Sequence, residues 1–152
     1  ESKGLREQFV DVIDIAPTVL DLVGIEAPDT FDGVPQMPLH GKSLRAVFQS
    51  PEAPAPRDTQ YWELWASRSI YHQGWKAMAF HKHGTHFADD HWELYNQNND
   101  FTESTNLADT HPEKLKELQG LWWAEAEKYG ALPQLEARGG RTRSYNQIFL
   151  DK

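Results

Sequence analysis

Six side chains that could bind a metal ion or move a proton lie close together in the second half of the chain. They are His81, His83, His86, Asp89, Asp90 and His91. Imidazole and carboxylate groups suit zinc or another divalent ion. Their spacing matches no known ligand motif, so we interpret the segment first as a polar loop between two strands. A metal site and a substrate-contacting role remain alternatives.

Several common active sites are excluded by residue type. The chain contains no cysteine, which rules out a thiol nucleophile, thiolate metal sites and disulfide bonds. The only adjacent glycines, Gly139 and Gly140, follow no expected strand, so no phosphate-binding loop is predicted. The Gly-x-Ser-x-Gly motif of serine hydrolases is also missing.

Four tryptophans offer a different kind of site. Trp62, Trp65, Trp75 and Trp92 could form a surface on which a sugar ring stacks. Aromatic residues on a small sheet more often pack in the core, because their large apolar area is best buried. We therefore expect these side chains to be mainly structural.

The elements that position these residues follow from the hydrophobic pattern. Four aromatic-rich segments, at residues 61–65, 69–72, 75–80 and 91–95, predict neighbouring antiparallel strands with short links. The pair Gln73-Gly74 predicts a tight turn between the second and the third. The histidine-rich segment then connects the third strand to the fourth.

A long amphipathic helix is predicted after the strands. Its apolar residues, which recur at helical spacing, are Leu115, Leu118, Trp122, Ala126 and Tyr129. Thr110 and Glu113 have the spacing of a capping box at its start, and Gly130 suits its end. We expect an α+β fold, in which this one long C-terminal helix packs on a small four-stranded antiparallel sheet.

The N-terminal part predicts one short helix at residues 14–24. Asp14 can cap it, Pro17 lies in its first turn and Gly24 suits its end. Residues 8–12 before it predict the end of a strand. Residues 26–58 hold six of the nine prolines and predict a connector with one helical turn after Ser43.

The net charge and the hydropathy pattern exclude two classes of binding partner. The formal net charge is −8, and an acidic protein repels phosphate backbones, so we expect no nucleic-acid partner. No apolar stretch approaches the roughly 20 residues of a membrane-spanning helix, so we expect no membrane insertion.

Five short motifs, in this order, resemble the C-terminal part of bacterial type I sulfatases (arylsulfatases) of the alkaline phosphatase superfamily. Residues 12–25 (VIDIAPTVLDLVGI) resemble the family's DIAPTLLDLAG helix, and residues 41–44 (GKSL) its GxSL segment. Residues 68–77 (RSIYHQGWKA) resemble its RAI…GDWKA hairpin. Residues 93–107 (ELYNQNNDFTESTNL) resemble ELYDLxxDPxExxNL, and residues 111–113 (HPE) open the last helix.

This resemblance implies that the chain is the end of a longer sulfuric ester hydrolase. Residues 1–25 would be the tail of its α/β catalytic domain, to which helix 14–24 would belong. Residues 26–58 would be the connector, residues 59–130 the small sheet with its helix, and residues 131–152 an irregular tail.

The resemblance places the catalytic chemistry outside this chain. The family's nucleophile is a formylglycine made from Cys or Ser in Cys/Ser-x-Pro-x-Arg, and a divalent cation such as calcium is bound beside it. None of the seven serines begins that pattern. We therefore expect no catalytic residue, no metal ligand and no cofactor here, and no activity of the chain alone.

The resemblance also implies a role for the histidines. In some sulfatases a histidine in the loop after the third strand of the small sheet reaches the substrate pocket. His86 lies in that loop, as do His83 and His81. We therefore expect these three residues at the rim of the pocket.

The expected partners are the missing N-terminal catalytic domain and, through it, a sulfate ester substrate. Without that domain, Val19, Leu20 and Val23 of helix 14–24 lose their cover, which predicts self-association of the chain. For localisation we expect a soluble protein of the bacterial cytoplasm or periplasm.

Two other hypotheses stay open. A related phosphonate or phosphate ester hydrolase would have a similar C-terminal domain, because substrate choice lies in the missing pocket. A non-catalytic binding module would use the tryptophans for sugar or the histidines for a metal ion.

Overall fold

The computed structural model describes residues 4–134, which form two compact units divided between Asp58 and Thr59. The expected tail at residues 131–152, with its Gly139-Gly140 pair, lies outside the described residues from residue 135 onward. Its first four residues contain no helix or strand.

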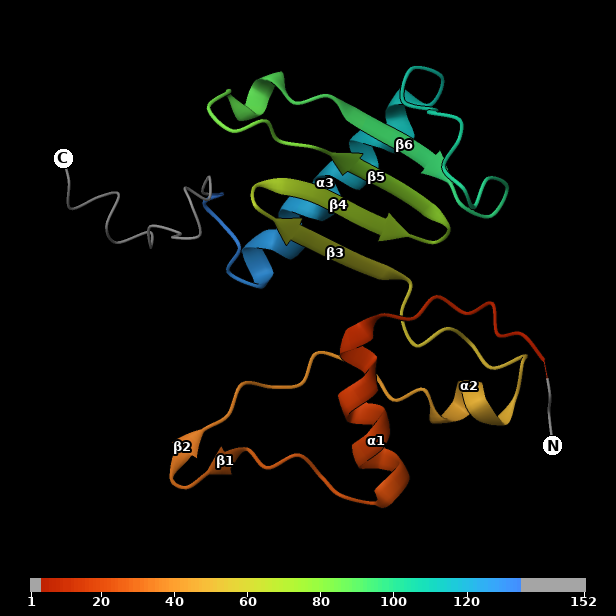
Figure 1. Ribbon diagram of the computed structural model, residues 1–152, viewed down its shortest axis with the longest axis vertical. Coiled ribbons are helices and arrows are strands. Elements are labelled where there is room, and N and C mark those ends of the chain that lie inside the picture. The colour runs from red at the N-terminus through yellow and green to blue at the C-terminus, as the bar shows by residue number, and fades with distance from the viewer. Residues whose placement is uncertain (1–3, 135–152) are drawn as a thin grey trace. The chain divides into compact units, whose positions relative to one another are not determined.

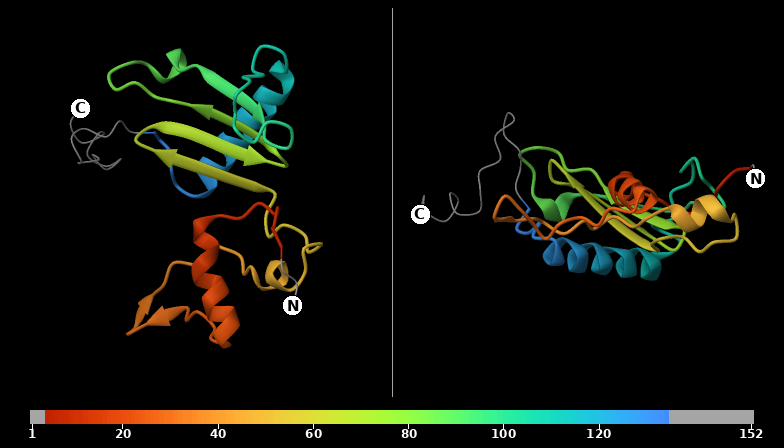
Figure 2. Two further views of the ribbon diagram at one scale, coloured as in Figure 1. Left: turned by 45° about the vertical axis from the view of Figure 1, so that its right-hand side comes forward. Right: turned by 90° about the horizontal axis from the view of Figure 1, so that it is seen from below.

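The second unit is an antiparallel sheet of four strands in the order β3-β4-β5-β6, with the helix α3 across one face (Figure 1). The elements are β3 (Thr59–Leu64), β4 (Ser67–His72), β5 (Trp75–Ala79), β6 (Trp92–Asn96) and α3 (Pro112–Lys128). Figure 2, seen from below, shows α3 running along one side of the sheet. The expected α+β fold is confirmed.

The core of this unit lies between the sheet and α3. Ile70 pairs with Ala77, which pairs with Leu94, and all three side chains are fully buried. From α3, Leu118 and Trp122 pack against this row and are also fully buried. Strand alternation and helical spacing thus bring apolar side chains to one interface, as the sequence pattern predicts.

The start of α3 differs from the expected capping box. His111 occupies the N-cap position and makes no capping hydrogen bond through its side chain. The Thr110 hydroxyl lies 3.2 Å from the carbonyl oxygen of Leu107, to which it donates. The hydroxyl that was expected to cap the helix therefore closes the turn before it. Pro112, at the first helical position, needs no partner because it has no N–H.

The first unit is built around α1 (Ile15–Val23), which a 3-10 turn at Val12–Asp14 precedes. Gly24 ends α1 at a φ of +71°, as expected. Residues 8–12 do not form the expected strand end, because Asp11 instead caps the 3-10 turn by accepting the N–H of Ile13 at 3.1 Å.

The connector contains more structure than its proline content indicates. It holds a small hairpin of β1 (Thr30–Phe31) and β2 (Val34–Pro35), followed by the short helix α2 (Arg45–Gln49). The side chain of Gln8 donates to the carbonyl oxygens of Pro51 and Ala53 at 2.7 and 2.8 Å. The proline-rich segment is thereby held against the irregular N-terminal segment that contains Gln8.

Asp14 does not cap α1 through its side chain, contrary to the expectation. Its carboxylate is fully buried and accepts the backbone N–H groups of Asp11 and Lys42 at 2.9 and 2.7 Å. It also forms an ion pair with Arg57. A buried carboxylate is stable only when its oxygens are paired. Asp14 therefore joins three segments of this unit, those that contain Asp11, Lys42 and Arg57.

Candidate functional site

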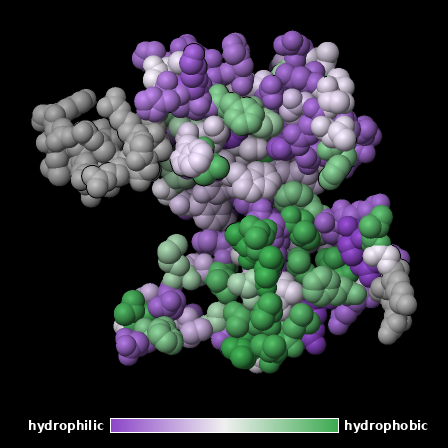
Figure 3. All heavy atoms as spheres, in the orientation of Figure 1, coloured by the Kyte–Doolittle hydropathy of each residue, from purple (hydrophilic) through white to green (hydrophobic). Residues whose placement is uncertain are grey.

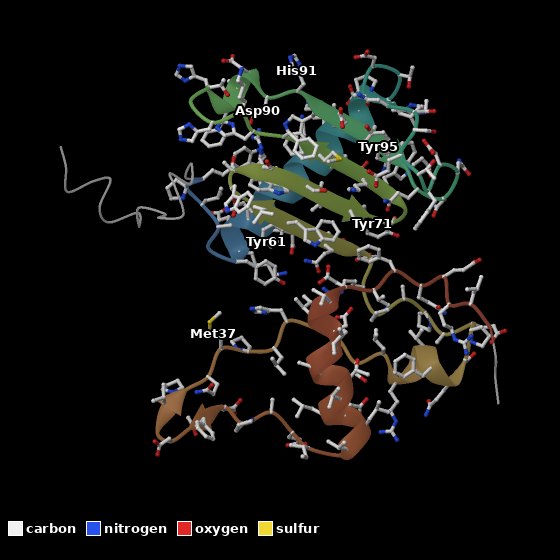
Figure 4. All side chains as sticks on the ribbon, in the orientation of Figure 1. Met37, Tyr61, Tyr71, Asp90, His91 and Tyr95 are labelled. Carbon is white, nitrogen blue, oxygen red and sulfur yellow. The ribbon has the colours of Figure 1, made fainter. Side chains whose placement is uncertain are left out.

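The connection between β5 and β6, residues 80–91, carries the histidines that the sequence analysis selected. Ala79 pairs with Trp92 at the last rung of the sheet, so the two ends of the connection start side by side. A single 3-10 turn at Phe87–Asp89 lies within it. Figure 4 labels Asp90 and His91 near its return to the sheet.

A buried charged cluster holds the base of this loop; it consists of Arg68, His81 and Asp90 and is called the Asp90 cluster below. Nδ1 of His81 lies 3.0 Å from both carboxylate oxygens of Asp90. One of these oxygens also forms an ion pair with Nη2 of Arg68. The side chains of Arg68, His81 and Asp90 are 3%, 1% and 3% exposed. Because His81 lies near the start of the loop and Asp90 near its end, the cluster ties both ends together and to β4.

Two aromatic rings, those of Phe87 and Trp92, pack against the Asp90 cluster. Phe87 stacks on His81 with ring centroids 4.2 Å apart and an interplanar angle of 25°. The guanidinium of Arg68 lies 5.0 Å from the ring centroid of Trp92, within cation–π distance. Burial lowers the pKa of Arg68, and the nearby Asp90 carboxylate opposes that shift. Arg68 stays protonated, since no ordinary environment deprotonates a guanidinium.

The structure separates the three histidines that were expected at a pocket rim. His81 is buried within the Asp90 cluster, whereas His83 and His86 are exposed on the loop beyond it. His86 stands at the N-cap of the 3-10 turn and makes no capping bond through its side chain. The loop therefore presents two imidazoles on a base that is fixed to the sheet.

Metal binding finds no support in this geometry. Among residues 4–134, no group of three or more His, Asp or Glu side chains is arranged to hold a metal ion. In the Asp90 cluster the carboxylate already faces the guanidinium of Arg68, whose positive charge would repel a cation. The described residues do not fit calcium or zinc, and no metal-dependent step is derived from them.

Arg68 is the member of the site that the sequence analysis missed. It alternates with Ile70 on β4, so both side chains belong to the face that α3 covers. Arginine is almost never fully buried unless it is paired. A charged residue at a core position of a strand was the available signal, and its partner, 22 residues away, could not be read from local spacing.

The motifs in the second unit hold the fold together. The side-chain oxygen of Asn106 accepts the backbone N–H groups of Leu94 and Ala108, each at 3.0 Å. The N–H of Leu107 donates to the carbonyl oxygen of Leu94 at 2.8 Å. Through these bonds the last two residues of the motif, Asn106 and Leu107, fix the loop after β6 to Leu94 of β6 itself.

In the first unit the motifs also contact one another. The hydroxyl of Thr18 accepts the N–H of Leu44 at 2.9 Å, and that of Ser43 donates to Asp21. A side chain at Gly41 would overlap the backbone carbonyl of Ile13. The GKSL segment is therefore seated on α1 and requires glycine at its first position.

A row of apolar side chains along α1 and its flanks lacks cover. Val12, Ile15, Val19, Leu22, Val23 and Ile25 are each more than half exposed. Figure 3 shows hydrophobic residues gathered over α1. Large exposed apolar patches mark surfaces that another protein surface covers. None of the helices within residues 4–134 has the length and apolar character that crossing a bilayer requires.

Comparison with known proteins identifies the family. Residues 1–122 match the family model described as N-sulphoglucosamine sulphohydrolase, C-terminal. An uncharacterised sulfatase from Schizosaccharomyces pombe is 35% identical over 121 residues, which are 78% of this chain and 21% of that protein.

Solved structures agree with this match. BT4656, solved in complex with its substrate D-glucosamine-2-N,6-O-disulfate, has a TM-score of 0.54 and 25% identity, and the match covers 79% of this chain and 24% of that one. Ps i-CgsB, at a TM-score of 0.52 and 20% identity over 80% of this chain and 24% of that one, supports the fold alone.

The chain spans about a fifth to a quarter of the length of these relatives. The motif order, the small sheet with its helix and the family match over residues 1–122 all agree. The chain belongs to the N-sulphoglucosamine sulphohydrolase C-terminal family and is the C-terminal domain of a type I sulfatase.

Proposed function

We propose that this domain serves a sulfatase that removes sulfate from a sulfated amino sugar, and that it forms part of the rim of the substrate pocket. The observation that carries the proposal is the family match over residues 1–122. The substrate named for BT4656, a disulfated glucosamine, supplies the substrate class.

The chemical step belongs to the N-terminal catalytic domain in this proposal. The chain contains no cysteine, and no serine begins the Cys/Ser-x-Pro-x-Arg pattern from which the family's formylglycine is made. The formylglycine and a divalent cation such as calcium would therefore be supplied by the catalytic domain. The domain described here would be inactive alone.

The contribution of this domain is to present donors to an anionic substrate. His83 and His86 are exposed, and so is Lys82, which precedes His83. Imidazole N–H and ammonium groups donate hydrogen bonds to sulfate oxygens. Groups that hold a substrate work best on a rigid support, and the Asp90 cluster provides one. His81 has a positioning role in this arrangement.

The apolar surface of α1 would be covered by the catalytic domain. Leaving several aliphatic side chains in water forgoes about 25 cal/mol per Å² of apolar surface. When the chain is prepared alone, we expect it to self-associate through Val19 and Val23, which are exposed. Light scattering should show a dimer or larger species, and replacing both residues by serine should give a monomer.

The rim role is tested in the full-length enzyme by steady-state release of sulfate from D-glucosamine-2-N,6-O-disulfate. His86→Ala should raise KM about tenfold, and His83→Ala should act in the same direction. His40→Ala, an exposed histidine of the first unit, is the matched control and should leave KM unchanged. A wild-type KM in both loop variants would refute the rim role. Cleavage of a phosphonate monoester but no sulfate ester would favour the related hydrolase instead.

A further inference from the structure

The hairpin turn between β3 and β4 has an unusual composition. Leu64 pairs with Ser67, so the turn contains only Trp65 and Ala66. Their φ angles are +51° and +69°. Two-residue turns with both residues at positive φ normally use Asn-Gly, Asp-Gly or Gly-Gly. A bulky aromatic residue in this region is a conformational outlier, and such strain is typical of functional positions.

The contacts of the turn are made by Ala66 and leave the indole outside. The N–H of Ala66 donates to Oε1 of Glu63 at 2.7 Å, and its carbonyl oxygen accepts from Gln134 at 3.1 Å. Ala66 is fully buried, whereas Trp65 is 72% exposed. The strain at Trp65 is therefore not offset by burial of its own side chain. The surrounding bonds hold an aromatic ring out in solvent.

The turn lies at the same end of the sheet as the histidine loop. Arg68, one residue beyond the turn's closing pair, pairs with Ala79, the last residue of β5. Both connections leave the sheet at the left end in Figure 1. Leu64 and Phe80, which flank them, are exposed. This end thus combines an exposed indole with the exposed imidazoles of His83 and His86.

We propose that Trp65 is a binding residue that stacks on the sugar ring of the sulfated substrate. Sugar rings present apolar C–H faces to aromatic rings, while their sulfate and hydroxyl groups need hydrogen-bond donors. An indole beside imidazole donors matches both parts of such a ligand. The sugar is favoured as the occupant because the relative BT4656 takes a sulfated monosaccharide. The inference rests on the proposed function.

Substitution by glycine separates this role from a structural one. Glycine adopts positive φ without strain, so Trp65→Gly relieves the turn and removes the indole together. In the full-length enzyme we expect an unchanged or higher Tm, with KM for D-glucosamine-2-N,6-O-disulfate raised about tenfold. Trp65→Tyr should restore most of the wild-type KM. Trp123→Ala, an exposed tryptophan on α3, is the control and should leave KM unchanged.

An unchanged KM for Trp65→Gly would overturn the proposal, whatever the Tm. If the Tm were also lower, the indole would have the structural role of packing against protein. If the wild-type enzyme releases no sulfate from this sugar, the proposed function fails separately. Calorimetric titration with the same sugar then decides the role of Trp65. Weaker binding by Trp65→Gly than by the wild type supports it, and equal binding or no heat refutes it.

Discussion

Lys76 and Glu103 join two distant motifs of the second unit through a two-point contact. Nζ of Lys76 lies 2.8 Å from Oε1 and 3.0 Å from Oε2 of Glu103, and both side chains are 23% exposed. Gln97 donates to the same carboxylate at 2.7 Å. Lys76 belongs to β5 and Glu103 to the loop after β6. Both residues lie in the motifs that resemble sulfatases, and together they hold this loop on the sheet.

The Lys76–Glu103 pair should show a coupling free energy of about 1 kcal/mol, the upper value for a partly exposed ion pair. A double-mutant cycle with Lys76→Met and Glu103→Gln, followed by urea denaturation, measures it. The pair Lys114–Glu117 on α3, whose side chains are 30% and 47% exposed, is the control and should couple by only about 0.3 kcal/mol. Equal coupling in the two pairs would show that burial adds nothing at Glu103.

Asp90→Asn should destabilise the second unit by about 3–5 kcal/mol, because it leaves the buried guanidinium of Arg68 without a counter-charge. Replacing both residues, as Arg68→Met with Asp90→Leu, should recover most of this loss, since no unpaired charge then remains. Chemical denaturation of the three proteins checks both statements. A double variant no more stable than Asp90→Asn would contradict this explanation.

Gly41→Ala should destabilise the first unit by about 1–3 kcal/mol, because the added methyl group must displace the backbone at Ile13. Gly120→Ala is the matched control. Gly120 lies on the exposed side of α3 with open space around it, so alanine there should stabilise by about 1 kcal/mol. Thermal unfolding of both variants should therefore shift in opposite directions. A harmless Gly41→Ala would mean that Gly41 does not pack against the backbone of Ile13.

Asp100 should make the second unit sensitive to acid. The N–H of Thr105 donates to its carboxylate at 2.8 Å, and the hydroxyls of Ser104 and Thr102 donate at 3.0 and 3.1 Å. These bonds, that of Thr105 first, lower the pKa of Asp100 below its ordinary value of about 3.9. A lowered pKa gives stability that is present above the unfolded-state pKa and is lost as the pH falls through the folded-state value.

Asp100→Asn should accordingly be less stable than the wild type at pH 7, and the difference should shrink as the pH falls below the unfolded-state pKa of about 3.9. Urea denaturation across this range measures it, with the exposed Asp109→Asn as the control. A difference that stays constant with pH would show that the carboxylate charge is not involved.

The strands and α3 could be predicted because alternation and helical spacing are local properties of the sequence. They determine directly which side chains face the core. Ile70 and Trp122 lie where the pattern predicts. The errors arose where distant segments compete for a polar side chain. Asp14 has the sequence signature of a cap, yet its carboxylate accepts the backbone N–H of Lys42 and pairs with the guanidinium of Arg57. No local rule contains that information.

The candidate site was predictable only in part. The histidines could be selected by type, and His83 and His86 are exposed on the loop between β5 and β6. The difference between these two and the buried His81 depends on Asp90 and Arg68, which fold together from three segments. The exposure of the Trp65 side chain depends on the positive φ angles of Trp65 and Ala66, and a Trp-Ala pair in the sequence does not indicate such angles.

The most direct test of the account compares sulfate release by two proteins: the chain of 152 residues and the full-length enzyme that contains it. Both are assayed on D-glucosamine-2-N,6-O-disulfate at equal molar concentration. We predict release by the full-length enzyme and none by the chain alone, because in our proposal the nucleophile belongs to the catalytic domain. Release of sulfate by the chain alone would contradict it.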